Sequence, residues 1–272
     1  MLLSLIFGVV IGAVMGLTGA GGGILAVPAL VVGMGWSMQE AAPVALIAVA
    51  ASAALGAFEG FRHGLVRYRA ALLMALMGFP FTALGSTLAH RLSQPLLMGL
   101  FSIVLLFAAS RMAVRGSAHA ERGPSDLERK AGRLDPETGR FHWNAPTFAL
   151  VGFIGALTGL MSGLLGVGGG FVIVPMLRRS TNLSMHGIVA TSLFLVALVS
   201  CTTVSLEVWR GARLPLVFCL VFVAATGIGM VGGRFAARHL PEQKVQWGFA
   251  LVLACVALGL AVKALGGASG IV

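Results

Sequence analysis

Two long charge-free runs constrain most strongly what this chain can fold into. Residues 1–39 and 141–177 contain no Asp, Glu, Lys or Arg, although a helix needs only about 20 apolar residues to cross the hydrocarbon of a bilayer. Each run is interrupted near its middle by a cluster of glycines. We therefore predict that each run holds two helical pieces rather than one long helix.

Further charge-free runs each have the length of one membrane crossing. They cover residues 41–58, 70–89, 92–110, 180–206, 214–233 and 245–262. Hydrophobic residues make up 58% of the chain and charged residues 10%, whereas soluble domains have roughly 25% charged residues. The sequence therefore predicts an all-α polytopic membrane protein, with about 8 transmembrane segments if each run is a span of this length.

The chain also contains an internal repeat, which a fold prediction has to accommodate. A shift of 147 positions places residues 163–177 on residues 16–30, and 9 of these 15 positions are identical. We predict two homologous membrane halves, residues 1–115 and 146–272, each with a Gly-interrupted helical element plus three transmembrane helices. The polar segment 116–145 is predicted to be a cytoplasmic loop between them, with a regulatory or partner-binding role as the alternative.

The positions of the cations favour an inverted repeat over a parallel one. Cytoplasmic loops of membrane proteins carry an excess of Lys and Arg. If the Gly-interrupted element enters the membrane and returns, 15 of the 19 Lys and Arg fall on one side; if it crosses once, 13 do. We therefore predict inverted halves with Arg62–Arg69 and Arg178–Arg179 in the cytoplasm. Because these cations and Arg111 stand at the ends of apolar runs, we expect them to meet lipid headgroups and predict no nucleic-acid partner.

The two glycine clusters are the best candidates for a binding site, because transporters bind substrates where matching helices of two repeats are interrupted. Glycine permits the positive φ angles of such a break, and the helix that follows offers unpaired N–H groups and a partial positive charge to an anion. Close helix packing is the alternative role for these glycines. We do not expect a nucleotide-binding loop at these clusters, since their spacing does not fit G-x-G-x-x-G, no βαβ pattern surrounds them and no GK[ST] follows. The predicted substrate-binding residues are Gly19, Gly21, Gly22, Gly23 and Ile24 in the first half and Gly166, Gly168, Gly169, Gly170 and Phe171 in the second.

Four polar residues near the clusters complete the predicted site. Thr191 and Ser192 are candidate hydroxyl donors to the anion, and the alternative is that they bond a carbonyl of the preceding turn. Gln39 and His186 occupy matching positions at the start of the following span. We interpret these two as a gate or substrate contact, with a helix-end interface role as the alternative.

Titratable and thiol groups within the apolar runs give little support to catalysis. Acids at membrane depth include proton carriers, but Glu59 and Glu207 stand near helix ends beside arginines, so we expect interfacial ion pairs, Glu207 with Arg210. Cys201, Cys219 and Cys255 lack zinc-site or disulfide spacing, and we interpret them as small buried hydrophobes. No catalytic triad, carboxylate pair or metal-ligand set has a recognisable spacing, so we predict no enzyme, no cofactor and no metal.

Several segments resemble the TauE/SafE sulfite exporters, also called the TSUP family. The resemblance rests on GLTGAGGGILAVPAL at 16–30 and GLLGVGGGFVIVPML at 163–177, and extends to GSTLAHRL at 85–92, ATSL at 190–193 and GMVGGRFAARHLPEQ at 229–243. It covers nearly the whole chain outside 116–145. The resemblance implies transport of sulfite, sulfonates or related small organic anions, usually by export across the inner membrane. The chain departs from the family at Val44-Ala45, where the first half often carries Thr-Ser, and this change affects substrate chemistry or the symmetry of binding.

Together these features predict a secondary transporter, an exporter or permease of small anions such as sulfite, sulfonates or related organic acids. We expect a multi-pass protein of the cell inner (plasma) membrane whose partners are a small anionic substrate and the lipid bilayer. A coupling proton or ion and a homo-oligomer are left open. An anion channel is the alternative function, because interrupted helices suit a channel too; a membrane-embedded enzyme is the third class.

Overall fold

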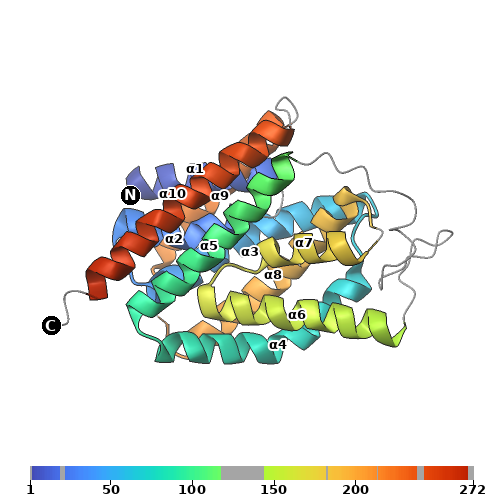
Figure 1. Cartoon of the computed structure of the whole chain (residues 1–272), viewed down its shortest axis with the longest axis horizontal. Helices are drawn as coiled ribbons and strands as arrows, with labels where there is room; N and C mark the ends of the chain where they lie inside the picture. The colour runs from blue at the N-terminus through green and yellow to red at the C-terminus, as the bar shows by residue number, and fades with distance from the viewer. Residues whose placement is uncertain are drawn as a thin grey trace.

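The computed structural model describes residues 2–18, 22–117, 144–181, 183–212, 214–237 and 242–268, whose regular elements are all helices (Figure 1). The first half contains α1 (Leu2–Thr18), the 3-10 helix η1 (Gly22–Leu25), α2 (Ala26–Met34), α3 (Met38–Arg62), α4 (Tyr68–Arg91) and α5 (Gln94–Ser117). The second half contains α6 (Ala145–Leu165), α7 (Gly170–Ser180), α8 (Met185–Trp209), α9 (Leu216–Ala237) and α10 (Glu242–Ala268).

The lengths of these helices confirm an all-α polytopic membrane protein. Within the described residues, seven helices are long and apolar enough to cross a membrane, namely α3, α4, α5, α6, α8, α9 and α10, and shorter apolar helices lie at 5–17 and 23–34. Every run predicted to cross once is a long helix. Each of the two longest runs is split into two pieces, as expected from its glycines: α1 precedes η1 and α2, and α6 precedes α7.

Large apolar side chains cover the outside of the bundle. Leu76, Leu220 and Ile228, for example, are about 70% exposed. Soluble proteins rarely expose so much apolar surface to water, whereas lipid solvates it well. Cys201 and Cys255 are exposed as well, so our interpretation of them as buried was wrong, whereas Cys219 is buried. The apolar content of the chain thus covers a lipid-facing exterior in addition to filling a core.

Small residues bring the helices of the two halves into close contact. The most extensive pairings are α4 with α6, α1 with α9, α5 with α10 and α3 with α8, and each joins the first half to the second. A Cβ on Gly155 would lie 2.2 Å from the carbonyl oxygen of Met74, and one on Gly12 would lie 2.1 Å from that of Thr226. Such close approach of backbones through glycine is a common way to join helices in a membrane. The two halves therefore interleave.

The same pairings map onto one another when the two halves are exchanged. In the sequence repeat, α1 to α5 correspond to α6 to α10, so the pair α4–α6 corresponds to α9–α1, and α3–α8 and α5–α10 correspond to themselves. Counting η1 with α2, each half contributes five helical pieces among the described residues. An inverted arrangement requires an odd number of membrane crossings in each half, and the inverted repeat stays a prediction.

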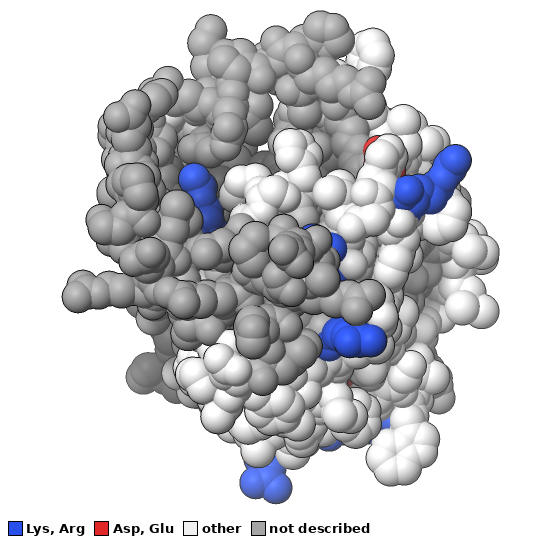
Figure 2. Space-filling model, turned by 90° about the vertical axis from the view of Figure 1, so that its right-hand side faces the viewer, with Lys and Arg blue, Asp and Glu red and all other residues white. Residues whose placement is uncertain are grey.

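Hydrogen bonds between helices show which connections share an end of the bundle. The N–H of Arg67, between α3 and α4, donates to Thr191 Oγ1 in α8 at 3.0 Å, so this connection lies at the same end as Arg178–Arg179, which precede α8. At the other end, Gln39 Nε2 donates to the carbonyl of Ala89, where α3 begins and α4 ends. Figure 2 views the end of the bundle that is on the right in Figure 1, and Lys and Arg side chains stand out on its described surface.

Candidate functional site

The break between α6 and α7 occurs at the predicted glycines. The φ angles of Gly166, Gly168 and Gly169 are 71°, 73° and 71°, in the left-handed region that glycine tolerates best. Gly166 ends α6 and Gly169 is the N-cap of α7. Because Gly169 has no side chain to accept a hydrogen bond, the first N–H groups of α7 receive no side-chain cap. The N–H of Val172 donates to the carbonyl of Gly169, whereas those of Gly170 and Phe171 have no acceptor within the helix.

These glycines also meet neighbouring helices at short range. A Cβ on Gly169 would lie 2.4 Å from Cγ2 of Thr158, and a Cβ on Gly168 would lie 2.8 Å from Oγ of Ser200. Both contacts are shorter than ordinary van der Waals distances, so a larger residue cannot enter without displacing α6 or α8. The two roles considered for the glycines, helix interruption and close packing, therefore occur at the same positions.

The interrupted element of the first half meets this break inside the bundle. Gly19 and Gly21 lie outside the described residues, and Gly22 begins η1. A Cβ on Gly23 would lie 3.3 Å from the carbonyl oxygen of Val167, and Ile24 is only 1% exposed. The two glycine-rich elements, about 147 residues apart in the chain, are thus neighbours in space.

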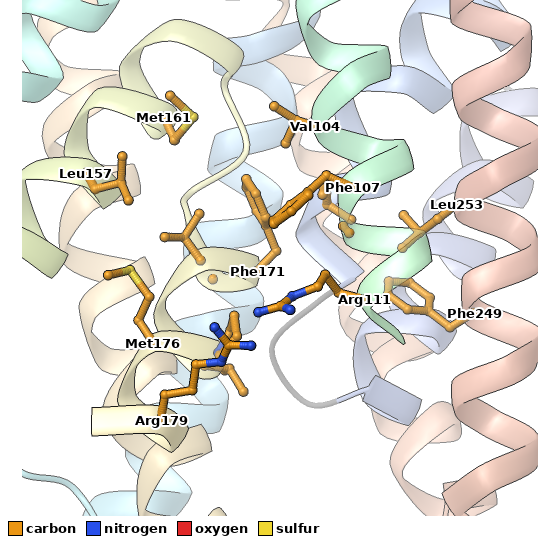
Figure 3. Close-up of a pocket in the computed structure, with 16 residues that line it drawn as sticks. Val104, Phe107, Arg111, Leu157, Met161, Phe171, Met176, Arg179, Phe249 and Leu253 are labelled. Atoms are coloured by element: carbon orange, nitrogen blue, oxygen red, sulfur yellow. The ribbon is translucent and has the colours of Figure 1, made fainter. Parts of the chain in front are cut away.

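A cavity of about 460 Å³ lies beside the start of α7 (Figure 3). Its walls are mostly apolar and come from α5, α6, α7 and α10, with Ile24 from η1. Among the predicted site residues, Ile24, Gly170 and Phe171 line it. The other lining residues used below are Phe107, Leu157, Met161 and Leu253.

Two arginines give this apolar cavity its charge. Arg111 of α5 and Arg179 of α7 both line it, and Figure 3 shows their guanidinium groups turned toward one another. Arg111 also lies over the ring of Phe107, 5.7 Å from its centroid. Within the part of the chain that the structure describes, no carboxylate is paired with either guanidinium. Two cations facing each other without an acid between them attract an oxyanion, which a guanidinium holds through two parallel hydrogen bonds.

The structure keeps the other predicted site residues away from this cavity. Thr191 Oγ1 accepts the N–H of Arg67, and Ser192 Oγ donates to the carbonyl of Val189 at 2.8 Å, the local alternative that the sequence left open. Gln39 lines a second, much smaller cavity. His186 is exposed at the start of α8. The structure therefore gathers Ile24, Gly170 and Phe171 and separates these four residues from them.

Sequence reasoning missed both arginines of the cavity and misassigned the partner of Glu207. Arg111 and Arg179 were interpreted as interfacial cations, because each ends an apolar run and nothing in the sequence relates them. We expected Glu207 to pair with Arg210, and this was wrong. The Oε2 atom of Glu207 instead lies 2.9 Å from Nε2 of His90. Among the described residues, no group of three acidic, His or Cys side chains could hold a metal ion.

The fold and the cavity define a class of polytopic α-helical membrane proteins with a largely apolar cavity among their helices. Within that class, the family model described as Sulfite exporter TauE/SafE matches residues 4–260. The chain belongs to this family, as its glycine motifs indicated, and membership implies a multi-pass membrane transporter of sulfite-type anions. A transporter family agrees with the prediction of no enzymatic activity. No curated protein and no solved structure matched the chain.

Proposed function

We propose that this chain is a secondary carrier that exports small organic sulfonates and related organic acids across the inner membrane. In this proposal the anionic head lies between Arg111 and Arg179, and the carbon skeleton occupies the apolar part of the cavity toward Phe171. The observation that carries it is the convergence of two guanidiniums on an apolar cavity beside the N-terminus of α7, neither of them paired with a carboxylate of the described residues. Its volume of about 460 Å³ falls within the usual range for small-molecule sites.

The energetics favour an anion that has an apolar body. A charge-assisted hydrogen bond contributes about 1.5–3 kcal/mol, and a helix N-terminus adds at most about 2 kcal/mol. Apolar surface contributes roughly 25 cal/mol for each Å² removed from water. Sulfite can use only the polar contribution, whereas a small sulfonate also displaces water from the walls formed by Leu157 and Met161. Hydrogen bonds and apolar contacts of this size give reversible recognition, as export requires.

The opposite end of the bundle favours a carrier over a channel. There Glu207 of α8 contacts Ser86 and His90 of α4, which joins the two helices at the end away from Arg111 and Arg179. A cavity lined by cations toward one end, with helices joined at the other, is the arrangement expected for one state of alternating access. An open channel would leave both ends accessible at once.

Calorimetry with the purified protein tests this proposal. We expect benzenesulfonate to bind and benzenesulfonamide, a neutral analogue of the same shape, to bind far more weakly. Arg111→Gln and Arg179→Gln should each weaken benzenesulfonate binding at least about tenfold, since each removes a charge-assisted hydrogen bond. Arg91→Gln, on the exposed C-terminal end of α4 and outside both cavities, is the matched control and should change nothing.

Transport in proteoliposomes completes the test. The wild-type protein should exchange labelled benzenesulfonate for unlabelled anion with saturable kinetics, and sulfite and small carboxylates should compete while cations and neutral sugars do not. Equal affinity for benzenesulfonate and benzenesulfonamide would overturn the anion site. Flux that rises linearly with concentration would favour the channel.

A further inference from the structure

A buried cluster of polar side chains joins α4 to α8 at the end of the bundle opposite to the arginine cavity. Glu207, only 7% exposed, accepts a hydrogen bond from Ser86 Oγ and lies 2.9 Å from Nε2 of His90. Arg210 donates from Nη1 to Ser86 Oγ at 2.6 Å and from Nη2 to Thr87 Oγ1 at 2.7 Å. Both carboxylate oxygens are therefore held, and the arginine reaches Glu207 only through Ser86.

Buried hydroxyl groups continue from Glu207 into the membrane interior. Ser200, Thr203 and Glu207 are three and four residues apart, so they lie on one face of α8. Thr158 and Ser162 share a face of α6 in the same way, and Ser162 Oγ lies 3.3 Å from Thr203 Oγ1. All four hydroxyl-bearing residues are at most 2% exposed. Helices that otherwise contain apolar and small residues thus turn polar faces toward each other.

This line of hydroxyls ends at the glycine break beside the substrate cavity. Ser200 lies against Gly168 and Thr158 lies against Gly169, the N-cap of α7. Within the described part of the chain, neither Ser200 Oγ nor Thr158 Oγ1 has a hydrogen-bond partner, which costs about 1–3 kcal/mol for each buried group. Ser200 turns its hydroxyl toward Gly168, whereas Thr158 turns its Cγ2 methyl toward Gly169. Two unsatisfied hydroxyls beside the same glycine break indicate a place for water or a mobile proton.

Near Glu207 the line is interrupted by a second cavity. A space of about 20 Å³ is lined by Thr203, Glu207, His90 and Gln39, which is room for about one water molecule. The side chain of His90 is 45% exposed, so the cluster also has contact with the surface at this end. A proton therefore has polar groups to follow from that surface to Glu207, and from Glu207 toward α7.

We propose that Glu207 is the binding site of a proton whose movement is coupled to anion transport, with the hydroxyl line as its connection to the substrate site. The inference rests on the proposed function. Among the described residues, the charged or titratable groups near Glu207 are His90 from α4 and Arg210 from the end of α8. The described residues that α3, α5 and α6 contribute to the cavity beside it are uncharged. An acid at such a position in a membrane span has a functional role by default.

The step transfers one proton and no electrons. A proton from the aqueous phase adds to the Glu207 carboxylate and converts it to the neutral acid, and the same proton leaves when the carboxylate forms again. The neutral acid is no longer attracted by the positive charge of Arg210 or of a protonated His90. Protonation therefore weakens the contact between α4 and α8, the contact that has to open for substrate to leave at this end.

Proteoliposomes with an imposed pH gradient test the inference. Benzenesulfonate is a suitable probe, since its charge does not change with pH, and potassium with valinomycin holds the membrane potential at zero. We expect the wild-type protein to accumulate benzenesulfonate in response to the pH gradient. Glu207→Gln should keep benzenesulfonate exchange at equal pH and lose the pH-driven accumulation. Glu59→Gln, which changes an exposed acid of α3, is the matched control and should keep both.

The outcomes separate this inference from the proposed function. If the wild-type protein does not exchange benzenesulfonate at equal pH, the proposed carrier function is contradicted. Exchange without pH-driven accumulation in the wild-type protein, or coupling that survives in Glu207→Gln, overturns the proton site alone. If Glu207→Gln does not purify as a folded protein, Ser86→Ala serves instead, because it removes one hydrogen bond to the carboxylate. This variant should shift the pH at which accumulation is half-maximal, and an unchanged pH profile would overturn the inference.

Discussion

At the scale of single residues, Gly169 combines a backbone angle and a steric limit that few side chains can satisfy. Its φ is 71° and its added Cβ would lie 2.4 Å from Thr158 Cγ2. We predict that Gly169→Val abolishes benzenesulfonate transport, because a β-branched residue is strained at this φ and its methyl groups displace the start of α7. Gly35→Val is the matched control: its φ is 73° with nothing within 4 Å, so it carries the backbone strain alone. Wild-type transport by the purified Gly169→Val variant would contradict a role in binding.

The residue scale is also where sequence and structure differ most. The motif located Ile24, Gly170 and Phe171 at the cavity because a helix break has a local signature in glycine. The approach of Arg111 to Arg179 has no such signature, since it depends on how α5 packs beside α7. For the same reason, the sequence could not predict His90 as the partner of Glu207. It suggested Arg210 instead, because Arg210 is close to Glu207 in the chain.

At the scale of helices, the contact between α4 and α6 depends on glycines spaced along one face. We predict that Gly155→Ala destabilises the protein by about 1–3 kcal/mol, as overpacking does, because the new Cβ would lie 2.2 Å from the backbone oxygen of Met74. Gly152→Ala on the same helix should stay within about 0.5 kcal/mol, since its nearest neighbour is Met77 Cγ at 3.6 Å. Thermal unfolding of the two variants in detergent measures the difference, and equal midpoints would mean that α4 and α6 can separate at little cost.

Elements were far more predictable than their contacts. Charge-free runs of membrane length located the long helices, and serines mark two of their starts: Ser37 accepts from the N–H of Glu40, and Ser184, 147 positions later, accepts from that of Gly187. These signals are local in the chain. The pairing of each half with the other is a tertiary property, so the repeat alone predicted two units and did not reveal that they interleave.

At the scale of the whole molecule, the charges at the two ends of the bundle define its orientation. The contact of Arg67 with Thr191 places the α3–α4 connection at the end where α8 begins, and α4 ends at the opposite end with Arg91. Under the predicted topology, 15 of the 19 Lys and Arg belong to the first of these ends. Because cytoplasmic segments carry the excess of cations, we predict that this end faces the cytoplasm.

Cysteine labelling from either side of the membrane tests that orientation. The label needs an exposed position, which excludes the 1% exposed Thr181 between α7 and α8. We therefore choose Arg62→Cys, His186→Cys and Arg91→Cys, which change exposed residues. Each is made in a chain whose three native cysteines are replaced by Ala. An impermeant maleimide added to intact cells should label Arg91→Cys alone; the other two should react only after the membrane is opened. Labelling of His186→Cys but not Arg62→Cys from outside would separate two ends that the structure joins, and would contradict the inverted arrangement. Labelling of both from outside, with Arg91→Cys protected, would keep the arrangement and reverse the orientation, so that the arginine cavity would receive its substrate from the other side of the membrane.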